Sequence, residues 1–174
     1  MRSVIPLRQR PLDIAWLIFF VVNLTFITYI VDLEQLVIDD PNKFEYPLWP
    51  PRALVDMVHW WGRTFDPPQW ARPAWWRATI WIDVLLFGPF YVAAIYAFLK
   101  GKEWIRMPTV IWGSMMFTNV SIILFEELVG PHATPEPAVV LAANAAWAIV
   151  PVILIARMWR NPHPFTREDA PSPR

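Results

Sequence analysis

Acidic side chains inside otherwise apolar segments are the residues of this sequence best placed to do chemistry. Asp83 interrupts the apolar run TIWIDVLLFGPF, and Asp32, Glu126 and Asn144 lie within or at the ends of other apolar runs. A carboxylate in hydrocarbon costs at least ~2.5 kcal/mol, so such residues tend to be rare, paired and functional. Two neighbouring carboxylates can share a proton, which suits proton transfer. Whether these groups form one site depends on the elements that carry them.

The composition is typical of a single-domain membrane protein. The chain has 174 residues, of which 56% are hydrophobic. These residues are concentrated in four blocks, and most of the 12 Trp and 4 Tyr flank the blocks. Aromatic residues in these places are typical of membrane interfaces.

The same composition argues against several kinds of site. The net charge is zero, which gives no general attraction to nucleic acid, and there is no Cys to act as a nucleophile or metal ligand. The histidines His59, His132 and His163 do not have the spacing of a metal site. We therefore expect no metal, no cofactor and no nucleic-acid partner.

Four segments are long and apolar enough to span a bilayer as helices, since about 20 residues cross its hydrocarbon core. They are residues 12–31, 79–99, 109–125 and 138–159. The first is longer than the apolar core of a signal peptide and lacks a cleavage site of small residues, so we interpret it as a span. The predicted fold is therefore all-α, a polytopic membrane protein with a four-transmembrane-helix bundle in residues 1–160.

The positions of the basic residues predict the orientation. They gather before the first span, between the second and third, and after the fourth, whereas residues 126–137 contain no Lys or Arg. Positively charged loops stay in the cytoplasm, so both termini are expected there. The membrane would be the endoplasmic reticulum in a eukaryote and the plasma membrane in a bacterium.

The segments outside the spans carry three further expectations. The long loop 33–78 is rich in Pro and Trp and reads as a cap on the outer interface. Within it, Pro51 is placed to open a short helix with Leu54, Val55, Val58 and Trp61 on one face. We expect residues 161–174 to be a disordered tail, and Glu126 and Glu127 to form a solvated helix end.

Counting along the spans brings the polar residues to a similar depth. Each span offers at least one polar group to its outer half, and these groups are Thr28, Asp32, Asp83, Asn119 and Asn144. Asp83 is about four residues into its span, or roughly 6 Å, and Asn144 about six, or roughly 9 Å. Pro89 and Pro151 would bend two of the helices and so open a cavity between them. The alternative is that these groups only form hydrogen bonds between helices.

Short motifs in a fixed order resemble those of the EXPERA family of membrane proteins. They are YAFLKG at 96–101, Asp32-Leu33 at the end of the first span, Phe65-Asp66-Pro67 in the cap, an acid six residues before Pro89, and LFE at 124–126. The resemblance covers about residues 12–160. It implies a four-helix bundle whose cavity opens sideways into the lipid, and it suggests a homodimer.

The resemblance also implies a ligand and its anchors. In sigma-2-like members, the acid at the position of Asp32 pairs with the cationic amine of a ligand, supported by the acid at Asp66, and the acid at Asp83 lines the cavity. A carboxylate with aromatic walls suits such a ligand through charge-assisted bonding and cation–π contact. The expected partner is thus a hydrophobic small molecule or lipid, sterol-like or cationic and amphiphilic.

The sterol-isomerase branch of the family offers a second interpretation. Asn144 and Trp147 match its site residues, but Thr28 stands where that branch has a His and Ile80 where it has a Glu. As an isomerase that shifts a double bond from Δ8 to Δ7, the protein would use Asp32 and Asp83 as catalytic proton carriers. A third reading, in which the polar cluster only locks the bundle of a structural or trafficking protein, stays open from the sequence.

Overall fold

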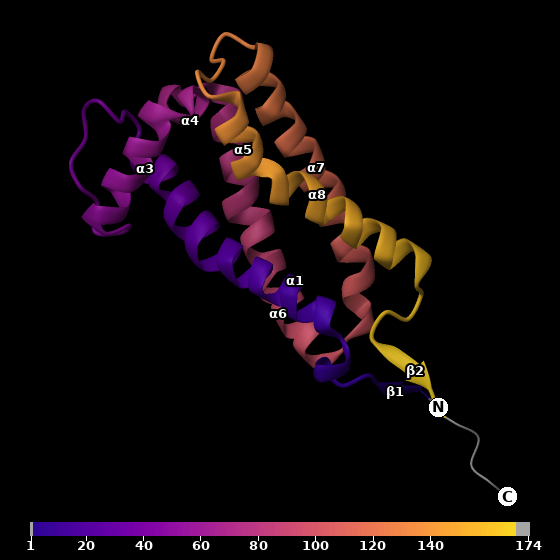
Figure 1. The fold of residues 1–174 in the computed structure, drawn as a ribbon. Coiled ribbons are helices and arrows are strands. Elements are labelled where there is room, and N and C mark those ends of the chain that lie inside the picture. Colours follow the sequence, from indigo (N-terminus) through magenta and orange to yellow (C-terminus); the bar gives the residue numbers. More distant parts are fainter. Residues whose placement is uncertain (1, 170–174) are drawn as a thin grey trace, which may run out of the picture.

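A computed structural model describes residues 2–169 of the chain, and in this part four helices are long and apolar enough to cross a membrane (Figure 1). They run over Pro11–Val37, Ala74–Lys100, Glu103–Val129 and Pro137–Arg160. The prediction of an all-α membrane protein with four spanning helices is confirmed. The bundle end that carries the termini is called the inner end below, and the opposite end the outer end.

Two of the spans are composite helices. The first consists of α1 (Pro11–Val22), η2 (Asn23–Asp32) and α2 (Leu33–Val37), and the second of α5 (Ala74–Ile82), η3 (Asp83–Phe87) and α6 (Gly88–Lys100). The third span is the short 3-10 turn η4 (Glu103–Ile105) followed by α7 (Arg106–Val129), and the fourth is α8 (Pro137–Arg160).

Both η2 and η3 are π-helical, which the hydropathy pattern does not reveal. Pro89 explains η3, because it lacks an N–H and its ring clashes with the carbonyl four residues earlier, so the preceding turn widens. The two π-helices contact each other. Asp32 is the last residue of η2 and Asp83 the first of η3. The wide turns therefore carry the two acids of the spans that the sequence singled out.

The spans are longer than predicted at their outer ends. The first continues to Val37 rather than to residue 31, and the third to Val129 rather than to residue 125. A span predicted from hydropathy ends where the first acidic residue appears. Here the helices continue through Glu34 and Glu127, whose side chains are both completely buried. These acids are inside the fold because other elements cover them.

A cap over the outer end is built from α3 (Arg52–Thr64) and α4 (Pro67–Ala71). As predicted, α3 begins directly after Pro51, and it buries Val55 and Val58.

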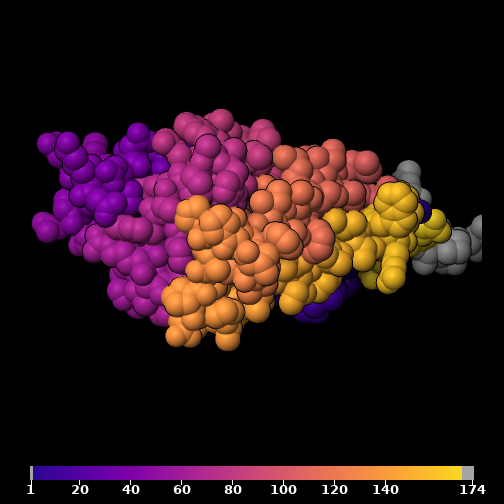
Figure 2. All heavy atoms as spheres, turned by 90° about the horizontal axis from the view of Figure 1, so that it is seen from above, coloured from indigo at the N-terminus to yellow at the C-terminus, as the bar shows by residue number. Residues whose placement is uncertain are grey.

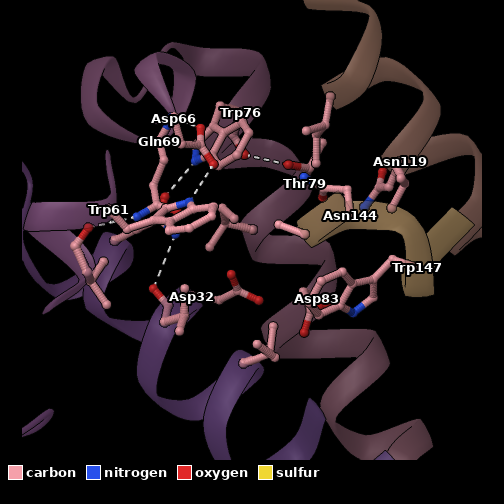
Figure 3. Close-up of a pocket in the computed structure, with 18 of the residues that line it drawn as sticks. Asp32, Trp61, Asp66, Gln69, Trp76, Thr79, Asp83, Asn119, Asn144 and Trp147 are labelled. Carbon is pink, nitrogen blue, oxygen red and sulfur yellow. Dashed lines mark hydrogen bonds between the residues drawn. The ribbon is translucent and has the colours of Figure 1, made fainter. Parts of the chain in front are cut away.

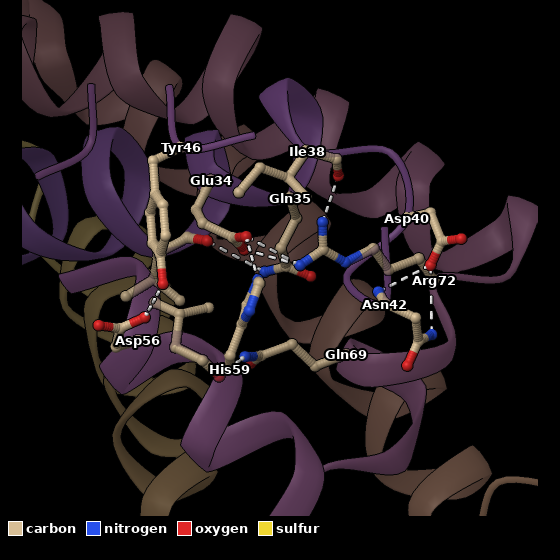
Figure 4. A network of polar contacts seen from close by, with 12 residues as sticks. Glu34, Gln35, Ile38, Asp40, Asn42, Tyr46, Asp56, His59, Gln69 and Arg72 are labelled. Atoms are coloured by element: carbon tan, nitrogen blue, oxygen red, sulfur yellow. Dashed lines mark hydrogen bonds and ion pairs between the residues drawn. The ribbon is translucent and has the colours of Figure 1, made fainter. Parts of the chain in front are cut away.

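An ion-pair network attaches this cap to the first span (Figure 4). Glu34 of α2 accepts hydrogen bonds from Arg72 Nη2 at 2.8 and 3.0 Å, and one of its oxygens lies 2.8 Å from His59 Nε2. Arg72 also donates to the carbonyl oxygen of Ile38. All three charged or polar side chains are buried, so the cap is fixed to the bundle rather than resting loosely on it.

The inner half of the bundle is a dense aromatic core. Phe20 packs edge-on against Phe98 and Trp112 at ring-centroid distances of 5.4 and 5.7 Å, and Phe90 stacks on Trp112 at 4.9 Å. Such pairs add to the stability that burial of apolar area already gives.

At the inner end, residues after the fourth span fold back onto the N-terminus. β2 (Thr166–Glu168) pairs antiparallel with β1 (Arg2–Val4), and Phe165 is fully buried. The expectation of a disordered tail from residue 161 is therefore wrong for residues 161–169, because Phe165 provides an apolar anchor that composition alone does not reveal. Residues 170–174 lie outside the described part. Figure 2 shows the cap in violet at one end of the molecule and the C-terminal segment in yellow at the other.

Candidate functional site

A cavity of about 350 Å³ lies in the outer half of the bundle, beneath the cap (Figure 3). Sites for small molecules usually enclose about 300–1,000 Å³, so this one is at the lower end of the range. The residues that surround it come from η2 and α2, α5 and η3, α7 and α8, and from α3, Asp66 and α4 of the cap. Its polar lining residues are Asp32, Gln35, Asp66, Gln69, Thr79, Asp83, Asn119 and Asn144.

Asp32 and Asp83 form an acid pair at the centre of the site. Their side chains are buried and line the cavity, and the two carboxyl groups are close enough to interact with each other. Two carboxylates at such a separation repel each other strongly, so the pair favours holding one proton or meeting a cation. Thr28 was expected among the ligand-binding residues, but it lies beside the cavity and donates its hydroxyl to Asp83. Thr28 is therefore placed to orient the Asp83 carboxyl.

Asp66 reaches the cavity from the cap. It is the N-cap of α4, where its Oδ1 accepts the backbone N–H of Gln69 at 3.0 Å, and its Oδ2 accepts the Trp61 indole N–H at 3.4 Å. Burial raises the pKa of the Asp66 carboxyl, although these two donors oppose the rise. Asp66 is therefore both a structural cap of a helix end and an acid on the wall of the cavity.

Trp147, Asn144 and Asn119 line the side of the cavity formed by α7 and α8. The Trp147 indole N–H donates to Asn23 Oδ1 at 2.6 Å, and the amide of Asn23 donates to the carbonyl oxygen of Phe19 at 2.8 Å. Because α8 packs mainly on α7, this bond from α8 to η2 is an important link at that depth. With its N–H occupied, the indole offers the cavity its aromatic surface.

Several residues that shape the site were missed by the sequence argument. Trp76 forms a wall and donates its indole N–H to Gln35 Oε1 at 2.6 Å, and Asn23 orients Trp147. Gln35 follows Asp32 by three residues, about one helical turn. Extending the first helix past residue 31 would have placed it on the same face.

The charges around the cavity are all of one sign. Asp32, Asp66 and Asp83 line it, and no Lys, Arg or His side chain does so within residues 2–169. The remaining walls are largely apolar and aromatic, including Phe26, Phe87 and several tryptophans. A buried acid without a built-in cation is suited to binding a proton or a positively charged group.

The expectation that Glu126 and Glu127 form a solvated helix end is wrong for Glu127. Its side chain is fully buried beside Asp66. Glu126 is partly exposed, and its Oε1 lies 2.6 Å from His132 Nδ1. The turn after α7 causes this difference, because the backbone N–H of Thr134 returns to the carbonyl oxygen of Glu127 at 2.8 Å and covers it.

A family comparison is consistent with this architecture. The family model of EXPERA, the expanded EBP superfamily, matches residues 53–158, which is more than half of the chain. The chain belongs to the EXPERA family. The match includes the second, third and fourth spans, the cap helices and most of the cavity wall, so the family assignment and the bundle describe the same part of the molecule.

Three relatives align with most of the chain. Sigma intracellular receptor 2 of Xenopus tropicalis is 27% identical over 161 residues, which are 86% of this chain and 90% of the relative. The protein of that name from Macaca fascicularis is 28% identical over 166 residues, or 86% and 89% of the two chains. The one from Homo sapiens is 28% identical over 151 residues, or 79% and 81%. The four apolar spans, the EXPERA match and the similarity to these receptors show that this chain is an integral membrane protein.

Proposed function

We propose that this EXPERA protein binds a hydrophobic, sterol-like or cationic amphiphilic molecule in its outer cavity, with Asp32 as the anchor of the head group. The observation that carries the proposal is the closeness of Asp32 and Asp83 in a cavity that no cationic side chain lines among the described residues. A protonated amine would supply the missing positive charge. The names of the three relatives, which are receptors, support a binding role.

The rest of the cavity fits a ligand with an apolar body. Its walls carry the aromatic rings of Trp61, Trp76 and Trp147, which can hold either an apolar ring system or a cation by cation–π contact. Asp66, at the cap, would support the anchor. We infer that the ligand enters from the lipid between η2 and α8, where Asn144 and Trp147 are only half-buried.

A thermal-shift screen with hydrophobic amines and sterols on the detergent-purified protein tests this function. Binding amines should raise the melting temperature, and Asp32→Asn should weaken their affinity by about 10–100-fold, since charge-assisted bonds contribute about 1.5–3 kcal/mol. Asp39→Asn is the matched control, because Asp39 is exposed in the loop after α2 and pairs with Arg77. If Asp32→Asn binds amines as tightly as the wild type, the anchor is wrongly assigned.

The alternative function is that of a sterol or terpenoid double-bond isomerase. It is favoured by the meeting of Asp32, Asp83, Asn144 and Trp147 around one cavity, where the two acids could move protons and the indole face could stabilise a carbocation. Against it, Thr28 and Ile80 occupy the positions of two proton-handling residues of the isomerase branch. Incubating the protein with Δ8-sterols decides between the two, since only an isomerase yields the Δ7 product.

We also propose that both termini are cytoplasmic, in the endoplasmic reticulum of a eukaryotic cell or the plasma membrane of a bacterium. The chain has no Cys, so single cysteines can report the orientation. With an impermeant maleimide applied from outside the cytoplasm, Ala133→Cys should react and Lys102→Cys should not. We further propose a homodimer, which cross-linking in the membrane would detect; a monomer at all concentrations would exclude it.

A further inference from the structure

A second cavity, of about 390 Å³, lies between α3 and the loop before it, and the proposed function does not use it. Its volume is within the usual range for small-molecule sites. Aromatic rings, charged groups and a hydroxyl line it together. These lining residues are Phe44, Tyr46, Asp56, His59, Trp60, Arg63 and Thr64.

Aromatic side chains form the apolar part of this second cavity. The rings of Phe44 and Tyr46 lie edge to face with their centroids 5.1 Å apart, and Phe44 packs in the same way on the His59 ring at 4.8 Å. His59 is fixed by its bond to Glu34 in the network of Figure 4, so the wall belongs to the anchored part of the cap. Trp60 is 57% exposed, so its ring is accessible. Aromatic faces bind quaternary ammonium groups by cation–π contact.

Asp56 adds a carboxylate to the aromatic wall. Its Oδ1 accepts the hydroxyl of Tyr46 at 2.6 Å, which holds the acid beside the ring (Figure 4). Arg52, which does not line the cavity, lies over the Tyr46 ring, and its Nε is 3.9 Å from Asp56 Oδ2. Both side chains of this ion pair are more than half exposed, and such pairs contribute little. The carboxylate therefore keeps the capacity to bind a second cation.

Arg63 brings a positive charge to the same cavity. Its guanidinium lies over the Trp70 ring, 4.3 Å from the centroid, and among residues 2–169 no carboxyl group pairs with it. It differs in this from Arg77, which is paired with Asp39. An arginine without an acid partner is suited to binding a phosphate, because its planar fork of donors matches the phosphate oxygens. The cavity thus presents an anion, a cation and aromatic rings together.

The loop that carries Tyr46 also reaches the first span. The Trp49 indole N–H donates to the carbonyl oxygen of Tyr29 in η2 at 2.7 Å. Trp49 is half exposed and Leu48 is completely exposed. Because Tyr29 belongs to the outer half of a spanning helix, these apolar side chains lie at the level of the outer lipid interface, where Trp is favoured. A lipid whose chains lie against Leu48 and Trp49 would have its head group near the cavity.

We propose that the second cavity binds a phosphocholine-type head group, with its quaternary ammonium against the aromatic rings and Asp56 and its phosphate on Arg63. A zwitterion of this kind matches both charges of the lining, whereas Asp56 disfavours a simple anion and Arg63 a simple cation. The positions of Leu48 and Trp49 favour a membrane phospholipid over a water-soluble source of this group. The site is distinct from the acid cavity, although Trp60 lines both.

Native mass spectrometry of the full-length protein in detergent tests this site, because it counts bound lipid molecules. The wild type should bind phosphatidylcholine more tightly than phosphatidylglycerol with the same acyl chains. Arg63 is exposed, so Arg63→Gln should keep the fold and weaken phosphatidylcholine binding by about fivefold, the upper range for an exposed ion pair. Asp56→Asn should remove the preference for choline, while its amide oxygen still accepts the Tyr46 hydroxyl.

Arg77→Gln is the matched control, because it removes a positive charge from the outer end of the bundle without touching the cavity lining. Equal affinity of Arg63→Gln and the wild type for phosphatidylcholine, or a wild type without a preference for choline, overturns the inference. Asp32→Asn should leave lipid binding unchanged, so a failure here and a failure of the proposed function are distinguishable.

Competition with free glycerophosphocholine distinguishes the two sources of the head group. If only the intact lipid binds, the acyl chains contribute in the way that Leu48 and Trp49 indicate. If the free compound displaces the lipid at similar concentrations, the phosphocholine site stands and the membrane source is overturned.

Discussion

Two buried acid clusters lie at opposite ends of this bundle, and they differ in what neutralises them. At the inner end, Asp13 is 1% exposed, and both Arg10 and Arg157 donate to its carboxyl. In the outer cavity, Asp32 and Asp83 lie close together, and no cationic side chain among the described residues lines their surroundings. Burial is similar in the two places, but the chain supplies counter-charges in only one.

The difference separates a structural acid from an acid that is available to a ligand. At the inner end, Arg10 also donates to the carbonyl oxygen of Phe98 at 3.0 Å, so the cluster joins the first span, the second span and, through Arg157, the fourth. The cap follows the same rule, with Glu34 paired to Arg72 and His59. The acids of the cavity have no such cationic partner among the described residues that line it, and they are available to a cation from outside the chain.

The largest expected effect is at the inner end. Asp13→Asn would leave the buried Arg10 and the half-buried Arg157 without a counter-charge. We expect a loss of about 3–5 kcal/mol of stability, since breaking a buried ion pair from one side has this cost. Denaturant or thermal unfolding in detergent measures it. A variant as stable as the wild type would mean that Asp13 is not the structural acid described above.

The same substitution in the cavity sharpens the comparison. We expect Asp32→Asn and Asp83→Asn to change the stability of the unliganded protein by less than about 1 kcal/mol, because neither removes a partner from a buried cation and each relieves repulsion between two acids. The unfolding experiment used for Asp13→Asn gives the answer. Losses as large as those at Asp13 would favour the reading in which the cavity acids only lock the bundle.

The smallest effect concerns the dependence of stability on pH at Asp66. Burial raises the pKa of this acid in the folded state, so its contribution to stability is complete below the pKa of the unfolded chain and is lost as the pH rises through the folded pKa. Asn is a comparable helix N-cap, so Asp66→Asn should keep α4 and remove this decline. Melting temperatures from pH 4 to 8 should therefore fall less for the variant than for the wild type. Parallel curves would exclude a raised pKa at Asp66.

The depth of each polar residue in the bundle could be predicted from the sequence, but the direction in which its side chain points could not. A rise of about 1.5 Å per residue and the hydropathy blocks were enough to bring Asp32, Asp83, Asn119 and Asn144 to one level of the bundle. Which way a side chain points depends on helix rotation, and the π-helical turns change that rotation. Thr28 accordingly lies beside the cavity rather than in it.

The residues that were missed depend on distant parts of the chain. Glu127 is buried only because the turn through Thr134 folds over it, and Asp13 is tolerable only because Arg157, 144 residues away, returns to it. The ordered segment at 161–169 needs a site for Phe165 between the spans. Local composition carries no signal for any of these contacts.

The π-helix η2 has a consequence for how this site can change over evolution. A π turn contains about one residue more than an α turn, so deleting a single residue between Asn23 and Asp32 would let this stretch relax to an α-helix. The residues beyond the deletion would keep their orientation, and Asp32 would still point towards Asp83. The same deletion in an α-helical part of the span would rotate everything beyond it by roughly 100° and separate the two acids. The π-helix therefore lets the acid pair tolerate the loss of one codon in this stretch.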